Sequence, residues 1–206
     1  MALLHAATLS PSKLELISAW LPSRPWAPAN AADVELVGAY RLDDPEGEVG
    51  IEVHLATAGG VLVQVPLTYR AAPVDGLDDH LVATLEHSAL GRRWVYDGLR
   101  DPCLVRVLAA TALTGCGQAV GLVTRDGRWH VVPPTVRLAG GGWPGGPTTI
   151  DGFELISDDA DGAVLRNDHL ELWVARRPVV GEQPAIGLTG RRDGHGEPVV
   201  LAEVRT

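Results

Sequence analysis

The stretch VGIEVHLATAGGVLVQVPLTY, residues 49–69, decides the fold of the first half of this chain. On both sides of Gly59-Gly60, an apolar residue recurs at every second position. Successive side chains of a strand point to opposite faces, so the pattern predicts two strands, Val49–Leu55 and Val61–Tyr69, joined as a hairpin by the glycine pair. Each strand should have one buried face and a second face that is either wet or covered by a helix.

Further elements are predicted on both sides of this hairpin. Three more strands are expected at Val34–Leu42, Leu81–Ser88 and Arg92–Asp97. A first helix should begin at Ser10-Pro11, because a capping hydroxyl precedes a proline, and should run to about Leu21 with Leu14 on its buried face. A second helix should begin at Asp101-Pro102 and end at Gly115.

The chain after Gly117 has a different pattern, in which short apolar runs are separated by turns rich in Gly, Asp and Pro. The runs are Val120–Thr124, Trp129–Leu138, Phe153–Ile156, Ala163–Leu165, Leu170–Ala175, Ile186–Thr189 and Val199–Val204. No helix of ordinary length fits between them, so an antiparallel meander is expected, packed as a small barrel or sandwich. The predicted fold class is therefore α+β. A curved antiparallel sheet with two flanking helices should form a domain over residues 1–116, and an all-β domain should cover residues 117–206.

Composition restricts the partners and the compartment. The chain has 206 residues, a formal net charge of −9 and no basic cluster larger than an arginine pair. Nucleic acid and anionic membranes are therefore unsuitable partners, because phosphate binding needs compensating positive charge. The two cysteines, Cys103 and Cys116, would lie at opposite ends of the second helix, too far apart for a disulfide. With no recognisable signal peptide, the expected location is the cytoplasm.

Several familiar sites can be argued against from spacing alone. The glycine-rich loop 140–146 lacks the lysine and the following helix of a phosphate-binding loop. The segment 157–168 has some of the spacing of a calcium loop, but its first position is Ser157 and its twelfth is Asp168 rather than glutamate. The histidines form no metal-binding pair, and no nucleophile elbow is present. We therefore expect no metal, no cofactor and no catalytic residues.

One segment, residues 87–98, is dense in polar and aromatic residues and supplies most of the candidate binding site. The candidate ligand- or partner-binding residues are Arg92, Arg93, Trp94, Tyr96, Asp97 and, on the glycine-rich loop, Trp143. On a strand, Trp94 and Tyr96 would share one face, as an aromatic platform with an arginine and a carboxylate nearby. Such a platform would suit a sugar or the side chains of a partner, but cross-strand packing with an ion pair at the strand edge is the simpler explanation of the pattern.

The same segment, with its surroundings, resembles the N-terminal cap of actinobacterial maltokinases, and in particular small standalone proteins described as maltokinase N-terminal cap-like. The resemblance covers about residues 3–115 and is carried by Ser10–Trp26, Arg41–Glu52, Val65–Arg70, Leu90–Gly98 and Asp101-Pro102. It implies a curved antiparallel sheet with flanking helices. It does not imply kinase activity, because Trp173 stands where the kinase lysine would be needed and no HGD-type catalytic loop is present.

The resemblance implies a non-catalytic accessory or regulatory role in maltose, trehalose and α-glucan metabolism, through binding of a partner enzyme or an oligosaccharide. Two alternatives stay open at this point. The C-terminal half could form a barrel that binds a small ligand, or residues far apart in the sequence could assemble an enzyme site that no motif reveals. A second copy of the chain is a further open partner.

Overall fold

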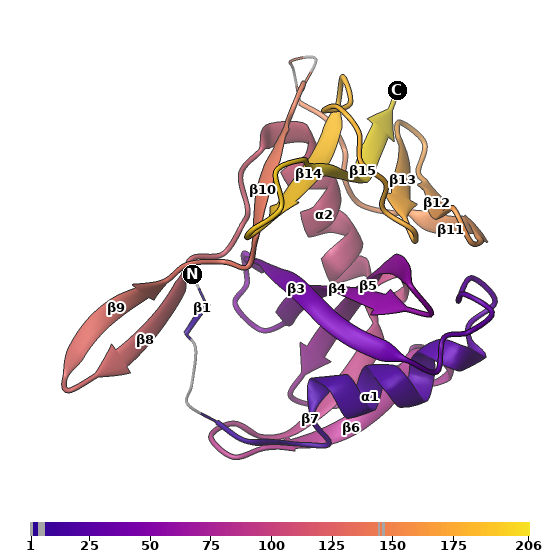
Figure 1. Ribbon diagram of the computed structural model, residues 1–206. Helices are drawn as coiled ribbons and strands as arrows, with labels where there is room; N and C mark the ends of the chain where they lie inside the picture. The colour runs from indigo at the N-terminus through magenta and orange to yellow at the C-terminus, as the bar shows by residue number, and fades with distance from the viewer. Residues whose placement is uncertain (1, 4–6, 144, 146) are drawn as a thin grey trace.

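In the computed structural model, residues 2–3, 7–143, 145 and 147–206 are described, and they form two six-stranded antiparallel sheets with a helix between them (Figure 1). The first sheet, hereafter the N-terminal sheet, has the strand order β2-β6-β7-β5-β4-β3. Its strands are β2 (Leu9–Ser10), β3 (Val34–Leu42), β4 (Gly50–Ala58), β5 (Val61–Arg70), β6 (Leu81–His87) and β7 (Gly91–Asp97). The predicted strands of the first half are thus confirmed within one residue at each end, except that β4 continues three residues beyond its predicted end at Leu55.

The hairpin β4–β5 has apolar packing on both faces of the sheet. Ile51 and Val53 belong to a buried cluster that contains the second helix, whereas Ala56 and Ala58 belong to a cluster that contains the first. The second face left open by the alternation is therefore covered by a helix. This matters for function, because polar residues at alternate positions of β4 are enclosed by protein.

Helix α1 (Lys13–Trp20) lies across the outer face of this sheet (Figure 1) and continues into the short helix η1 (Leu21–Ser23). Its cap is Ser12, whose hydroxyl accepts a bond from the N–H of Glu15 while the Glu15 carboxylate accepts one from Ser12. The predicted start at Ser10-Pro11 is wrong, because Ser10 ends strand β2. The expectation for Leu14 is also wrong: it is 42% exposed.

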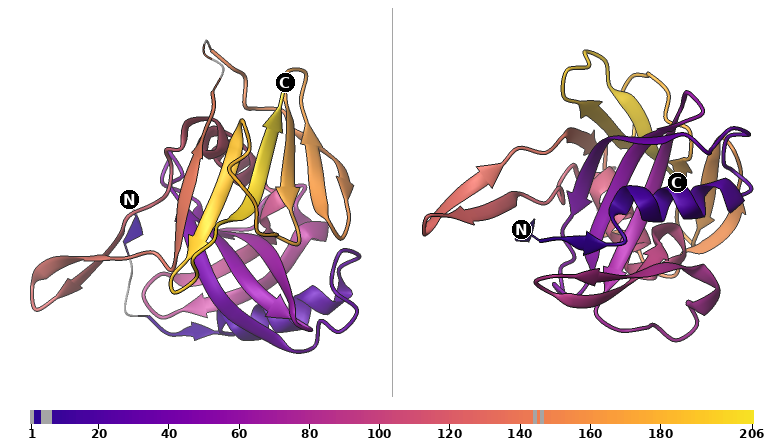
Figure 2. Two further views of the ribbon diagram at one scale, coloured as in Figure 1. Left: turned by 45° about the horizontal axis from the view of Figure 1, so that its top comes forward. Right: turned by 60° about the horizontal axis from the view of Figure 1, so that its bottom comes forward.

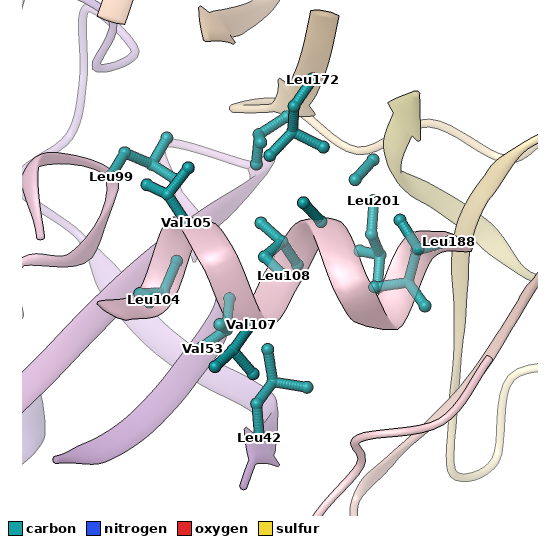
Figure 3. Packing of buried hydrophobic residues seen from close by; sticks show 14 of the residues in the cluster. Leu42, Val53, Leu99, Leu104, Val105, Val107, Leu108, Leu172, Leu188 and Leu201 are labelled. Carbon is teal, nitrogen blue, oxygen red and sulfur yellow. The ribbon is translucent and has the colours of Figure 1, made fainter. Parts of the chain in front are cut away.

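Helix α2 (Pro102–Thr114) packs against both six-stranded sheets, at the centre of the larger apolar core (Figure 3). As predicted, Asp101 caps its first turn and Gly115 ends it in a left-handed conformation, with φ of 71°. Its Leu104 and Leu108 lie in one cluster with Val53 of the N-terminal sheet and Leu201 of the second sheet. Within the described residues, no helix is long and apolar enough to cross a membrane.

The second sheet, hereafter the C-terminal sheet, has the open strand order β10-β14-β15-β13-β12-β11. Its strands are β10 (Val136–Gly141), β11 (Glu154–Asp158), β12 (Gly162–Arg166), β13 (Glu171–Ala175), β14 (Gly187–Arg192) and β15 (Val199–Arg205). The fold class predicted from the sequence, α+β with a curled N-terminal sheet and a second antiparallel sheet, is confirmed. The face that packs on α2 is filled with side chains such as Leu172 and Leu188.

A third, small sheet forms an arm that projects from the rest of the molecule (Figure 2). Strands β8 (Gly121–Arg125) and β9 (Arg128–Val132) form its hairpin, and β1 (Ala2–Leu3) pairs with β8 in parallel. The predicted run Trp129–Leu138 is therefore divided between β9 and β10. Pro133 and Pro134 lie between the two strands, and proline cannot donate a ladder hydrogen bond.

The two halves pack on a common core across the expected boundary at residues 116 and 117. Residues of β4, α2 and the C-terminal sheet belong to one buried apolar cluster. Polar contacts cross the same boundary: the buried Gln64 of β5 donates to the carbonyl oxygens of Ala175 and Leu201 at 2.9 and 3.1 Å. The division into two domains stays a prediction, but any such domains meet through an apolar contact.

Candidate functional site

Strand β7 passes from exposed to buried along its length and separates the residues predicted for one site. Arg92 is exposed and pairs with Glu86, its Nε lying 2.8 Å from Oε1. Arg93 is half-buried and donates from Nη2 to the carbonyl oxygen of Leu90 at 2.8 Å. Trp94 is half-buried as well. These three residues occupy the part of the strand that solvent reaches.

The remaining predicted residues lie elsewhere. Tyr96 is fully buried, and its hydroxyl accepts a hydrogen bond from the N–H of Val74 at 3.0 Å. Asp97 is buried at the junction of the two sheets. Trp143 is half-exposed beyond the end of β10, with its Nε1 3.4 Å from Thr148 Oγ1, and the neighbouring Pro144 and Gly146 of the glycine-rich loop lie outside the described residues. The predicted set therefore does not meet in one place, and its binding role stays a prediction.

A pocket of about 580 Å³ lies in the N-terminal sheet and is hereafter called the sheet pocket. Its polar wall consists of Lys13, Arg41, Asp43, Asp44, Glu48, Glu52, Tyr69, His87 and Arg93. Its apolar wall includes Leu9, Leu42, Val49, Ile51, Leu85 and Leu90. Of the residues predicted from the sequence, only Arg93 lines this pocket.

Glu52 forms the charged floor of the sheet pocket. Its side chain points to the α1 side of β4 and accepts a bond from Lys13 Nζ at 2.5 Å. Arg41 Nη2, from the neighbouring strand β3, lies 3.4 Å from both Glu52 carboxylate oxygens. Burial of the carboxylate opposes ionisation, but its interactions with His54, which is protonated only in acid, and with Lys13 and Arg41 outweigh burial and lower the pKa of Glu52 to about 2. Glu52 is therefore a carboxylate at neutral pH, with two cations beside it.

His54 and Tyr69 extend this polar cluster into the sheet. His54 follows Glu52 on the same face of β4, and its Nε2 lies 3.3 Å from the Tyr69 hydroxyl and 3.7 Å from Glu52 Oε2. Burial lowers the pKa of His54 to about 4, although the charge of Glu52 acts in the opposite direction. Burial also raises the pKa of Tyr69 well above its usual value. Both rings are therefore uncharged at neutral pH and serve as hydrogen-bonding groups.

The turn between β3 and β4 forms a defined rim of the sheet pocket. Asp44 accepts three backbone hydrogen bonds, from Glu46 at 3.2 Å and from Glu48 and Val49 at 2.9 Å each. Partial burial opposes ionisation of Asp44, but these bonds lower its pKa. The turn thus holds one wall of the pocket in place through its own backbone.

Acids and bases both line the sheet pocket, which therefore has no dominant charge. Three cationic side chains, Lys13, Arg41 and Arg93, face four carboxylates of the same lining. Such a lining offers both donors and acceptors, and apolar side chains line the same pocket. A neutral ligand with many hydroxyl groups can satisfy both kinds of group, because each hydroxyl donates and accepts. A strongly charged ligand would meet like charges.

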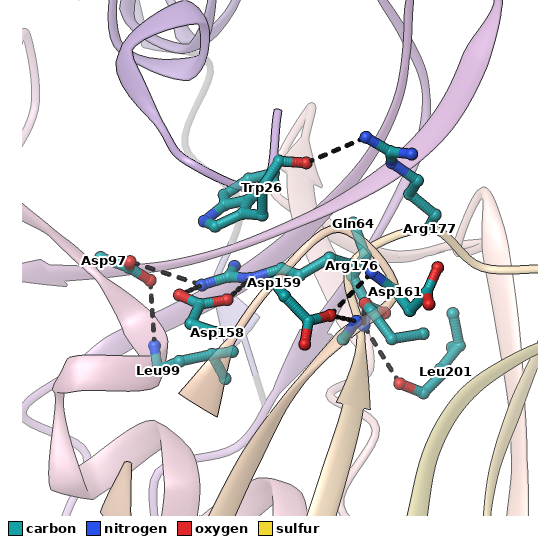
Figure 4. A network of polar contacts seen from close by, with 12 residues as sticks. Trp26, Gln64, Asp97, Leu99, Asp158, Asp159, Asp161, Arg176, Arg177 and Leu201 are labelled. Atoms are coloured by element: carbon teal, nitrogen blue, oxygen red, sulfur yellow. Dashed lines mark hydrogen bonds and ion pairs between the residues drawn. The ribbon is translucent and has the colours of Figure 1, made fainter. Parts of the chain in front are cut away.

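A second, buried charged cluster lies between the two sheets (Figure 4). Arg176, which directly follows β13, is fully buried and forms two hydrogen bonds of 2.8 Å to the carboxylate of Asp158. Its Nη2 is also 3.5 Å from Asp97, and its guanidinium lies 4.1 Å from the ring centre of Trp26. A pocket of about 360 Å³, hereafter the junction pocket, opens beside these carboxylates.

Glu52, His54 and Arg176 were missed by sequence reasoning. Glu52 and His54 occupy the polar positions of an alternating strand, which is the usual pattern of a solvated face. Arg176 belongs to an arginine pair at the end of a strand, with no sign of burial. One signal was available: Lys13 is the sole lysine of the chain, and it lies on a helix expected to cover the sheet.

Metal binding finds no support in side-chain geometry. Within residues 2–3, 7–143, 145 and 147–206, no group of three or more His, Cys, Asp or Glu side chains is arranged to hold a metal ion. The expectations of no metal and no cofactor stay predictions.

Comparison with known families identifies one segment of the chain. Residues 20–101 match the family model of the maltokinase N-terminal cap domain. This segment runs from the end of α1 to the cap of α2 and contains strands β3 to β7. The resemblance derived from the sequence is confirmed over this range. No curated protein matches the chain.

Proposed function

Residues 20–101 are a maltokinase N-terminal cap-like segment, and from that premise we propose that the chain is a non-catalytic accessory protein of maltose and α-glucan metabolism. Its sheet pocket would bind a maltose-type oligosaccharide. The observation that carries this proposal is the position of the pocket: all but a few of its lining residues fall inside the matched segment.

The dimensions and walls of the sheet pocket support a sugar ligand. Its volume of about 580 Å³ lies within the range of small-molecule sites. The apolar lining residues, which include Leu85 and Leu90, can contact the C–H faces of sugar rings. Glu52, Arg41 and Arg93 can then bond the hydroxyl groups, as acceptor and donors. An uncharged oligosaccharide also avoids the cost of placing a net charge among carboxylates.

A partner enzyme is the second candidate, supported by the projecting arm. Trp129 is 61% exposed and Val131 67% exposed on β9. Large apolar side chains on a projecting element are common at protein–protein contacts. Recovery of a maltose-handling or trehalose-handling enzyme with the tagged protein, and its loss with Trp129→Ala, would favour this candidate.

Calorimetric titration with maltose, maltotriose and trehalose tests the sugar proposal. We expect maltose or maltotriose to bind, and Arg93→Ala to weaken binding about tenfold, because it removes a charged hydrogen-bond donor from the pocket wall. Arg92→Ala is the matched control: the same residue type is changed one position away, outside the pocket, so affinity should be unchanged. Absence of binding by all three sugars, or equal losses in both variants, would contradict the proposal.

The non-catalytic part of the proposal has a separate test. Purified protein incubated with maltose, ATP and Mg²⁺ should form no phosphorylated sugar, as followed by ³¹P NMR. Turnover that scales with protein concentration would show that the chain is an enzyme.

A further inference from the structure

The junction pocket combines residues from both halves of the chain and lies apart from the sheet pocket. The N-terminal half contributes Trp20, Arg24, Pro25, Trp26, His80, Asp97 and Arg100 to its lining, and the C-terminal half contributes Leu155, Ile156, Ser157 and Asp158. The C-terminal residues all belong to β11, the edge strand of its sheet. A ligand here would touch both halves.

The two carboxylates of this pocket are already paired. Asp158 forms a bidentate pair with Arg176 behind the pocket wall. Asp97 also lies near Arg176 and accepts a bond from the N–H of Leu99 at 3.2 Å. These carboxylates therefore do not need Arg24 and Arg100, the two arginines that line the pocket.

Arg24 and Arg100, the two arginines that line the junction pocket, lack acidic partners in the part of the chain that the structure describes. Within the described residues, neither Arg24 nor Arg100 forms an ion pair. Arg24 donates to Ser23 Oγ, at 2.9 Å from Nη2, and its guanidinium lies 5.0 Å from the centre of the Trp20 ring. Behind them, Nη1 of the fully buried Arg176 has no hydrogen-bond partner. Counting Arg176, three arginines stand against two carboxylates, so the site is locally positive in a chain of net charge −9.

We propose that the junction pocket binds a phosphate monoester carried on a compact ring, such as a sugar phosphate. Arg24 and Arg100 would hold the phosphate oxygens, for which the planar guanidinium fork is well suited. The apolar side of the pocket, with Leu155, Ile156 and the edge of Trp20, would contact the ring. The volume of about 360 Å³ fits a ligand of that size.

Such a ligand would also connect the two halves of the molecule. Arg24 and Arg100 belong to the N-terminal half, and Ile156 lies on β11 of the C-terminal sheet. A ligand that contacts both binds the assembled state better than any state in which β11 has separated. Binding should therefore protect the amides of β11 from hydrogen exchange.

Titration with glucose 1-phosphate, inorganic phosphate and glucose, followed by calorimetry and amide NMR, tests this site. We expect glucose 1-phosphate to bind, inorganic phosphate to bind more weakly and glucose not to bind at this pocket. Arg24→Gln and Arg100→Gln should each weaken glucose 1-phosphate binding by about tenfold or more, because each removes a charge-assisted contact. Arg128→Gln is the control, since it removes the same charge from the exposed arm and should leave affinity within about twofold.

Three outcomes would overturn the proposal. The first is no binding of glucose 1-phosphate at concentrations up to about 10 mM, since a Kd weaker than this would correspond to very little binding free energy. The second is unchanged binding in the double variant of Arg24 and Arg100 when circular dichroism shows that the variant is folded. The third is equal affinity for inorganic phosphate and glucose 1-phosphate, which would show that the pocket does not bind the sugar ring. None of these results depends on whether maltose binds the sheet pocket.

Discussion

Two of the buried charged clusters of this protein, those around Glu52 and Arg176, are built with opposite signs. In the sheet pocket, one carboxylate, Glu52, lies between the cations of Lys13 and Arg41. Between the sheets, one cation, Arg176, lies between the carboxylates of Asp97 and Asp158. Both central groups are enclosed, but their partners differ in exposure. The side chains of Lys13 and Arg41 are 26% and 35% exposed, whereas those of Asp97 and Asp158 are 9% and 10% exposed.

Because of this difference in exposure, the partners of Glu52 can leave it to bind water or a ligand, whereas the partners of Arg176 cannot leave it. Lys13 and Arg41 reach solvent, so either can turn toward water or a ligand without leaving a buried charge unpaired. Asp97 and Asp158 have little access to water, and loss of Arg176 would leave two enclosed carboxylates close together. The Glu52 cluster therefore suits ligand binding, and the Arg176 cluster suits a structural link between the sheets.

The largest effect is expected for Arg176→Met. This change keeps much of the side-chain volume but removes the cation between two buried carboxylates, and breaking a buried ion pair from one side costs about 3–5 kcal/mol. We expect a loss of that size in the free energy of unfolding, measured by urea denaturation. Arg166→Met is the control: its pair with Glu171 is on the surface and contributes less than about 1 kcal/mol. Similar losses in both variants would refute the structural role.

The second prediction is a loss of stability in mild acid caused by His54. Its pKa is about 4 in the folded protein, against 6.5 for an unperturbed histidine. Below pH 6.5, His54 takes up a proton in the unfolded chain, whereas in the folded protein it does so only near pH 4. The contribution of neutral His54 to the free energy of unfolding is therefore fully present above pH 6.5 and decreases as the pH falls toward 4. Between pH 7.5 and pH 5 this amounts to about 2 kcal/mol.

The measurement compares urea denaturation at the two pH values in three proteins. His54→Gln should lose less stability than the parent protein on acidification, because it has no group to titrate at this position. His130→Gln, which removes an exposed histidine, should behave like the parent. Glu52, with its pKa lowered from 4.5 to about 2, loses its stabilising effect only as the pH falls below about 4.5, so it contributes little in this window. A parent-like acid response in His54→Gln would contradict the assignment.

The third prediction concerns the centre of the exchangeable cluster. Glu52→Gln removes the carboxylate but leaves an amide oxygen that can accept from Lys13, and both cations can reach water. We therefore expect a loss of about 1.5 kcal/mol in the free energy of unfolding, at the low end for a hydrogen bond to a charged group. A loss larger than that of Arg176→Met would reverse the roles given to the two clusters.

The sequence predicted the frame of both clusters but not the clusters themselves. Period-two alternation fixes β4 and β5 closely, and capping residues fix α2, because these signals are local. The pairing of Glu52 with Lys13 depends on how α1 packs across the sheet, and that of Arg176 depends on how two sheets meet. Such contacts join segments that are distant in the sequence, so no local sequence pattern predicts them. For the same reason, the sequence did not reveal that β7 becomes buried along its length, so that Trp94 is half-buried whereas Tyr96 is fully buried.

The smallest effect is expected when a partner rather than a centre is changed. Arg41→Gln removes a cation that is 35% exposed and 3.4 Å from the Glu52 carboxylate, while Lys13 still pairs with it. Exposed pairs of this kind contribute about 0.2–1 kcal/mol, so denaturation should show a loss below about 1 kcal/mol. Asp158→Asn is the matching change in the other cluster and should cost more, because its side chain is 10% exposed and forms two bonds to Arg176. Equal losses of stability in the two variants would show that the solvent exposure of the partner residues does not distinguish the two clusters. The argument that the partners of Glu52 can exchange with a ligand would then have no physical basis.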